Sequence, residues 1–295
     1  MNAKPILSAL LTLAAADAAR AHATAPVSPG DMNWTLDPWI VAPLAVTLWL
    51  FVVGAARLRA RGGGTARRAP QGAAYAAGWF ALAAALVSPL HWLGEHLFTF
   101  HMIEHEIVMA VAAPLLVVAQ PGGTLLWGLP HTARLAVGHV IHRLQAPWCW
   151  LTRPGPATLL HGIAIWAWHV PSFFDAALAS ETLHRLQHLS FFCTALLFWW
   201  SMLRRCTPGV AIWHLFVTML HTSILGAWMT LLPRVLYHLQ TEGAPAFGLT
   251  PLEDQQLAGV IMWVPAETAY AGAALYLAAQ WIRRSTPVPA RVVKA

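Results

Sequence analysis

Residues 97–119 read LFTFHMIEHEIVMAVAAPLLVVA, an apolar run with a polar cluster near its beginning. An α-helix needs about 20 apolar residues to cross the hydrocarbon core of a membrane. Two histidines, His101 and His105, stand four residues apart in this run. That spacing puts both imidazoles on one face of a helix. The stretch therefore predicts a membrane helix that carries two possible ligands near one end.

The composition extends this prediction to the whole chain. Hydrophobic residues make up 58% of the 295 residues and charged residues only 10%, whereas a soluble domain has roughly 25% charged residues. A membrane β-barrel would need alternating strands of about 10 residues, and the sequence has no such pattern. We predict an all-α integral membrane protein, a bundle of about seven transmembrane helices. The predicted spans are 38–57, 72–90, 97–119, 157–172, 185–203, 210–232 and 254–282.

Arginine and lysine give the predicted orientation of the spans. Outside the first 23 residues, one end of the bundle has only Arg185 and Arg234. The other end has Arg57, Arg59, Arg61, Arg67, Arg68, Arg134, Arg143, Arg153, Arg204, Arg205, Arg283, Arg284, Arg291 and Lys294. Because cytoplasmic loops are enriched in these residues, we predict a multi-pass protein of a bacterial inner (plasma) membrane. Its C-terminus would be cytoplasmic and its mature N-terminus periplasmic or extracellular.

The N-terminus is predicted to be a signal peptide over residues 1–23. Lys4 supplies a positive start, an apolar stretch follows, and Ala21-His22-Ala23 fits a cleavage site. An uncleaved amphipathic start is the alternative. Residues 24–285 would then form a single polytopic membrane domain, and residues 286–295 a cytoplasmic tail.

The segment 124–146 lies between the third and fourth predicted spans and is ambiguous. It mixes leucine, valine and tryptophan with His131, Arg134, His139, His142 and Arg143. We predict an additional amphipathic helix on the cytoplasmic surface. An eighth span is the alternative, but it would invert the later spans and put Arg204 and Arg205 outside.

A second histidine pair, His184 and His188, has the same spacing and begins the fifth predicted span. The topology places both pairs and His169 at the outer ends of spans, together with several acidic residues. On the third predicted span, Met102 and Met109 share an arc of about 100° with His101 and His105. Histidine with methionine is a ligand set suited to copper, especially Cu(I). The alternative is a set of hydrogen-bonded interfacial histidines with methionines that fill packing gaps.

Two ionisable residues, His221 and Glu267, are predicted to lie deep in the membrane. Such groups are costly there and are candidates for function, although a neutral side chain held by hydrogen bonds between helices is the alternative. Pro114 and Pro265 lie inside predicted spans, where each frees a main-chain carbonyl that needs another partner.

Several other classes fit the sequence poorly. The net charge of +6 comes from basic residues in short loops between spans. We therefore attribute this charge to membrane topology and not to binding of a nucleic acid. Cys149, Cys193 and Cys206 form no C-x-x-C motif, which argues against a disulfide framework or a thiolate zinc site. No G-x-S-x-G, H-E-x-x-H or adjacent His-His motif is present, so we predict no enzyme of those types.

Several segments resemble the multi-span CtaG family of cytochrome c oxidase assembly factors associated with caa-type oxidases. They are Asn33–Trp39, Ser88–Leu90, His101–His105, Trp168–Pro171, Leu183–His188, Asp254–Gly259 and Met262–Trp263. The similarity runs in matching order through most of residues 33–282. It implies a seven-span protein that matures a haem–copper oxidase by handling copper. In this chain two acids, Glu104 and Glu106, flank His105, and they would tighten metal binding or only change the surface charge.

We therefore expect a non-catalytic assembly factor that binds copper at the outer membrane face and aids its delivery to oxidase subunits. The expected ligands are His101, His105, His184 and His188, with Met102 and His169 as auxiliaries. The alternatives are a copper or haem transporter with a path through His221 and Glu267, a haem-binding electron carrier, and a metal-free structural chaperone.

Overall fold

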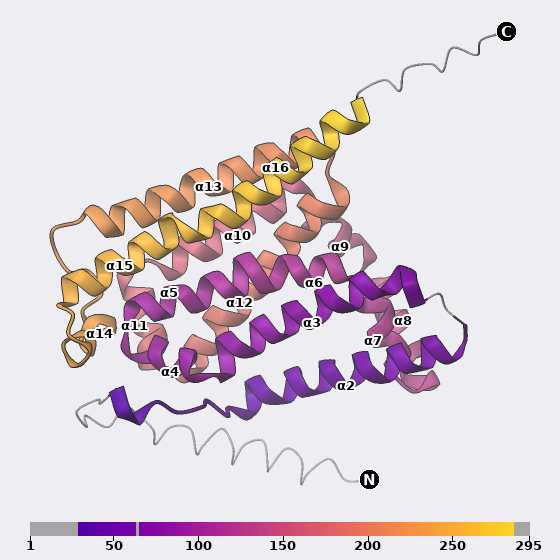
Figure 1. Ribbon diagram of the computed structural model, residues 1–295, viewed down its shortest axis with the longest axis horizontal. Coiled ribbons are helices and arrows are strands. Elements are labelled where there is room, and N and C mark those ends of the chain that lie inside the picture. The colour runs from indigo at the N-terminus through magenta and orange to yellow at the C-terminus, as the bar shows by residue number, and fades with distance from the viewer. Residues whose placement is uncertain (1–28, 63–64, 286–295) are drawn as a thin grey trace.

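The computed structural model describes residues 29–62 and 65–285, and within these ranges every regular element is a helix. Figure 1 shows long helices that run side by side along the longest axis of the molecule. Short helices α4 (Pro89–His96), α11 (Pro171–Ala179) and α14 (His238–Thr241) lie at one end, and α7 (Gly122–Gly128), α8 (His131–Arg143) and α9 (Gln145–Leu151) at the other. The predicted all-α membrane class is confirmed. The predicted signal peptide and the whole predicted tail, residues 286–295, lie outside the described residues.

In the described ranges, five helical segments are long and apolar enough to cross a membrane. They are α2 (Pro38–Ala60), the rod of α5 (Phe98–Glu106), the π-helical turn η3 (Ile107–Ala112) and α6 (Ala113–Ala119), α12 (Glu181–Trp200) with η4 (Ser201–Arg205), α13 (Pro208–Leu231), and α15 (Pro251–Trp263) with α16 (Pro265–Ser285). A sixth candidate joins residues 69–87 of α3 (Thr65–Val87) to α4 across a bend of 47°.

Among the seven predicted spans, 157–172 is the one whose helix is too short to count as a candidate membrane span. It corresponds to α10 (Pro154–Trp168), which has 15 residues and packs against α12 and α13. At 1.5 Å per residue such a helix is about 22 Å long, against a hydrocarbon thickness of roughly 30 Å. The described structure therefore supports five or six spans, and the seventh stays a prediction.

The segment 124–146 is divided by Leu129 and Pro130 into the end of α7 and the whole of α8. Helix α7 packs tightly on α2, where a Cβ atom at Gly54 would lie 1.9 Å from the Thr124 carbonyl oxygen. Helix α8 has no buried residue. Neither helix is long enough by itself to span a membrane, so the described residues give the alternative of an eighth span no support. The amphipathic surface helix stays a prediction, and the segment forms two helices in place of one.

The rod α5–η3–α6 is held at the point where Pro114 interrupts it. In the π-helical turn, the amide of Ala113 donates to the Val108 carbonyl, five residues earlier. Pro114 has no N–H to give the next carbonyl of that pattern, which is Met109. The indole N–H of Trp199 on α12 donates to this oxygen at 2.9 Å. The carbonyl that the sequence predicts to be free is thus satisfied by a neighbouring helix.

Two of the arginines predicted for the cytoplasmic side, Arg57 and Arg204, contact helix ends at the same end of the fold. Arg57 donates to the carbonyls of Trp127 and Leu129 at the end of α7, both at 2.9 Å. Arg204 donates to the Val118 carbonyl near the end of α6 at 2.9 Å. Arginine satisfies the last carbonyls of a helix and interacts well with its negative end. These contacts place Arg57 and Arg204, which belong to two of the predicted cytoplasmic connections, at the same end of the fold.

Candidate metal centre

A cluster of histidines lies at the opposite end of the fold, between α4, α5 and α12. We call His91, His101, His105, His184, His188 and the carboxyl group of Glu104 the histidine cluster. The ring centroids of His101 and His105 are 4.3 Å apart, and those of His184 and His188 are 4.6 Å apart. The two pairs face each other, with 5.5 Å between His101 and His184 and 4.9 Å between His105 and His188. The structure thus brings the two predicted pairs together.

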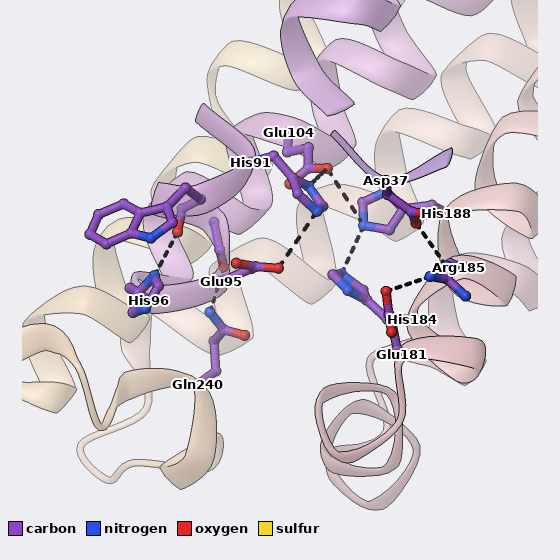
Figure 2. Close-up of polar contacts among 12 residues, drawn as sticks. Asp37, His91, Glu95, His96, Glu104, Glu181, His184, Arg185, His188 and Gln240 are labelled. Atoms are coloured by element: carbon purple, nitrogen blue, oxygen red, sulfur yellow. Dashed lines mark hydrogen bonds and ion pairs between the residues drawn. The ribbon is translucent and has the colours of Figure 1, made fainter. Parts of the chain in front are cut away.

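Two members of the cluster, His91 and Glu104, were not among the ligands expected from the sequence. Figure 2 shows His91 pointing at Glu104, with 2.7 Å between His91 Nδ1 and Glu104 Oε1. The same oxygen lies 3.6 Å from Nε2 of His188. Glu104 is three residues after His101, hence on the same helix face, which was the available signal. His91 lies on a different helix, and no sequence spacing connects it to the pairs.

Five of the ten ring nitrogens of the cluster are buried and lack a hydrogen bond within the described structure. Both ring nitrogens of His101 and of His105, Nδ1 of His188 and Oε2 of Glu104 have no partner of acceptable geometry among the described residues. His101, Glu104 and His105 are each at most 1% exposed. Buried polar groups are normally paired because an unpaired one costs free energy. Such unpaired nitrogens are what a bound cation would satisfy.

His169, the predicted auxiliary ligand, lies just after α10 and is also buried. Its Nδ1 donates to the Ile165 carbonyl at 2.6 Å, so the neutral ring has its lone pair on Nε2. That atom has no partner among the described residues. A histidine that donates through one nitrogen to a carbonyl is oriented to bind a metal through the other. His169 shares ring neighbours with the cluster, because Phe174 lies against both His169 and His101 and Phe191 lies against both His169 and His105.

The position of α5 is fixed by Asp254, which lies in the first turn of α15 and is completely buried. Its carboxyl oxygens accept from the amides of Phe98 and Thr99 at 2.8 and 2.9 Å and from the Thr99 hydroxyl at 2.7 Å. A residue of α15 therefore acts as the N-terminal cap of α5, one turn before His101.

Two further contacts hold the backbone around the cluster. A Cβ atom at Gly94 would lie 2.9 Å from Glu104 Oε2 and 3.3 Å from the His101 Cα, so glycine lets α4 approach α5 closely. The Tyr237 hydroxyl donates to the His169 carbonyl at 2.7 Å. Burial, and next the nearby Asp175, raise the pKa of Tyr237 above its usual value, which keeps this phenol a neutral donor.

An ion-pair network ties the start of α12 to the segment that precedes α2. Arg185 Nε lies 2.8 Å from Asp37 Oδ2, and Arg185 also pairs with Glu181 one turn earlier, as Figure 2 shows. Asp37 in turn caps α2 by accepting from the amide of Trp39 at 2.9 Å. The network thus ties the first turns of α12, which carry Glu181, His184, Arg185 and His188, to the segment that precedes α2.

The cluster is not a preformed metal site. Among the described residues, no three His, Cys, Asp or Glu side chains meet as ligands of one metal ion. Two ring nitrogens of the second pair, Nε2 of His184 and Nε2 of His188, lie 2.9 Å apart. With neutral rings, one of these nitrogens donates a hydrogen bond to the other. Chemically, the cluster offers up to five imidazoles and one carboxyl group, a set that suits Cu, Zn, Fe or Ni.

The remaining predicted residues lie elsewhere. Met102 and Met109 are buried in the main hydrophobic core with Phe98, Phe191 and Trp199. His221 Nδ1 accepts from the Trp166 indole at 3.3 Å, and Glu267 contacts Thr222. These two groups belong to α13 and α16 and are not part of the histidine cluster.

Comparison with known proteins adds one match. The family model described as cytochrome c oxidase caa3 assembly factor (Caa3_CtaG) matches residues 49–284. That range contains every member of the histidine cluster and Asp254. No curated protein and no solved structure matches the chain.

Proposed function

Because this chain belongs to the Caa3_CtaG family of cytochrome c oxidase caa3 assembly factors, we propose that it binds copper at the histidine cluster and aids its delivery to a haem–copper oxidase. One observation carries the copper part of this proposal. Five imidazoles from three helices are gathered around buried nitrogens that lack hydrogen bonds. A bound cation would satisfy the nitrogen that carries the lone pair in each neutral ring.

The proposed ligands are His101, His105, His184 and His188, with His169 and Met102 as auxiliaries. Imidazole nitrogen binds copper well, and thioether sulfur favours Cu(I). Ring rotation is required, because the nitrogens do not meet at one point as the side chains stand. His91 and Glu104 are proposed to orient the ligands, since a carboxyl group that bonds an imidazole fixes its tautomer and direction.

The location follows from the topology proposed for the chain. The cluster lies at the end of the fold opposite the contacts of Arg57 and Arg204. If the arginine-rich end is cytoplasmic, the cluster faces the periplasm of a bacterial inner membrane. Seven spans, with α10 completed by neighbouring residues, would give the outward N-terminus and cytoplasmic C-terminus. The chain would then act as a binding protein and not as an enzyme, with the oxidase subunits as its partners in the bilayer.

Copper stoichiometry of the purified protein tests the site. We expect the wild-type chain to retain copper through size-exclusion chromatography and the double variant His101→Ala with His184→Ala to lose it. The matched control is His139→Ala with His142→Ala, which removes two histidines from the exposed helix α8. Equal copper in the cluster variant and the control would contradict the proposal.

A metal-free structural chaperone is the second candidate, and the absence of three converging ligands among the described residues favours it. Complementation separates the two. In cells that lack this chain, the cluster variant should fail to restore the copper content and activity of the oxidase, while the α8 control restores both. Full restoration by a cluster variant without bound copper would support the metal-free function.

A further inference from the structure

A cavity lies at the end of the fold opposite the histidine cluster, where Arg57 contacts α7. It has a volume of about 860 Å³ and is enclosed by the last turns of α2, the first half of α3 and the connection from α6 to α7. Figure 1 shows these segments together at one end of the molecule. Ligand pockets have volumes of about 300–1,000 Å³, so this cavity is large enough for a ligand. Copper binding as proposed above does not use it.

Contacts between helices hold the walls of this cavity in place. Phe51 of α2, which lines it, stacks on Tyr75 of α3 with 3.7 Å between the ring centroids. Arg57 donates to the carbonyl of Trp127, another lining residue, at 2.9 Å. Gln120 turns the chain from α6 towards α7 with a φ of 49°, in the left-handed region that few residues other than glycine adopt. The cavity is therefore formed by the packing of the helices before any ligand binds.

Guanidinium groups without an acidic partner surround the cavity. Arg59 lines it, and Arg61 and Arg134 lie over the ring of the lining residue Trp127, at 4.5 and 4.2 Å from its centroid. None of these three arginines forms an ion pair within the part of the chain that the structure describes. The sequence has no Asp or Glu in residues 38–94 or 107–174, which include every lining residue. The uncompensated positive charge favours an anionic ligand.

The position of the cavity along α2 indicates which anion it would meet. Helix α2 is a candidate membrane span, and the cavity lies against its last turns, where the apolar run ends in Arg57 and Arg59. Val52 on the same part of α2 is 58% exposed, as expected for a side chain that faces lipid. The end of a span is the level of the lipid headgroups, and basic pockets between membrane helices bind anionic headgroups. An arginine fork also matches a phosphate group in geometry.

We propose that this cavity binds the headgroup of an anionic phospholipid, with its phosphate held by Arg59. Gln71 of α3 and Thr124 of α7 also line the cavity and supply polar side chains for the remaining headgroup oxygens. Phe51 and Leu58 supply an apolar wall on α2 for the first carbons of the acyl chains. A lipid bound in this way would join α2, α3 and the connection from α6 to α7 at the arginine-rich end of the fold.

Native mass spectrometry of the full chain, purified in detergent and mixed with dioleoylphosphatidylglycerol, tests the charge. We expect one retained phosphatidylglycerol, and much weaker retention of zwitterionic dioleoylphosphatidylcholine. Arg59→Gln removes a charged donor and should weaken phosphatidylglycerol binding roughly tenfold. The matched control is Arg283→Gln, which removes an exposed arginine from the last turn of α16 and should bind as the wild type does. Equal retention of the two lipids, or equal losses in the two arginine variants, would overturn the proposal.

A second pair of variants tests the cavity without changing any charge. Gly72 of α3 lines the cavity, and a Cβ atom there would meet nothing within 4 Å. Gly72→Leu should therefore fold, fill part of the space and abolish phosphatidylglycerol retention, while Gly138→Leu, equally open but on α8, should retain the lipid. Unchanged retention in Gly72→Leu would contradict the assignment. Excess inorganic phosphate should not displace the lipid, because it lacks acyl chains; displacement would indicate a site for free phosphate and overturn the lipid proposal.

Discussion

Asp254→Asn should uncouple α5 from α15 and weaken the histidine cluster without touching a histidine. The buried carboxyl group of Asp254 accepts three hydrogen bonds from the first residues of α5. Asparagine has the same shape but only one acceptor oxygen, and its NH₂ group would face the amide of Phe98. That amide would then be buried without a partner.

The magnitude follows from the contacts that are lost. A hydrogen bond to a charged group contributes about 1.5–3 kcal/mol, and a negative charge at a helix N-terminus adds about 0.3–1 kcal/mol. The variant should thus lose about 2–4 kcal/mol of unfolding free energy. At 1.4 kcal/mol per factor of ten, the folded-to-unfolded ratio falls roughly thirtyfold to several hundredfold.

Thermal unfolding in detergent, followed by size-exclusion chromatography after heating, measures this loss. The matched control is Glu253→Gln, the preceding residue, whose carboxyl group is exposed and caps its own helix through Thr250. We expect a clearly lower midpoint and weaker copper binding for Asp254→Asn than for the control. Equal midpoints would refute the reasoning that Asp254 positions α5.

Three other predictions use the same preparation. Trp199→Phe leaves the Met109 carbonyl without its donor and should cost about 1–3 kcal/mol, so an unchanged unfolding midpoint would contradict the role of this indole. Gly259→Leu places a Cβ atom 2.4 Å from Thr230 Oγ1 and should reduce the yield of monodisperse protein, whereas Gly138→Leu, with open space around it, should not; equal yields would argue against close packing of α13 on α15. Copper retention should fall as the pH drops below about 6, because a protonated imidazole cannot bind a metal; retention that does not depend on pH would argue against histidine ligands.

The positions of the long helices were predictable because each membrane helix needs a long apolar run. The predicted spans 38–57 and 210–232 correspond to Pro38–Ala60 and Pro208–Leu231. Bends and short helices were not predictable, because they depend on tertiary contacts. The carbonyl freed by Pro114 could be inferred from the sequence, but its partner, Trp199, lies 90 residues from Met109 along the chain.

The sequence predicted which candidate residues share a face of one helix, but it did not predict which residues of different helices meet. The four-residue spacing of His101 and His105 fixes their common face, since helix geometry is local. No local rule says that α4 lies against α5, so His91 stayed outside the predicted site. The burial of Asp254 was not predicted, for a related reason. An acid at the outer end of a span is typical of a solvated surface, and only the neighbouring start of α5 explains its burial.

The way in which α5 is held also constrains how copper would bind. The rod α5–η3–α6 is capped at its first residues by Asp254 and held at Met109 by Trp199, while Gly94 lets α4 approach too closely for a Cβ atom to fit. The backbone around His101 and His105 therefore has little room to shift. By contrast, no hydrogen bond within the described residues fixes the ring orientation of His101 or His105. Copper should thus assemble its ligands by ring rotation on fixed helices, and the helix positions should change little between the copper-free and copper-bound protein.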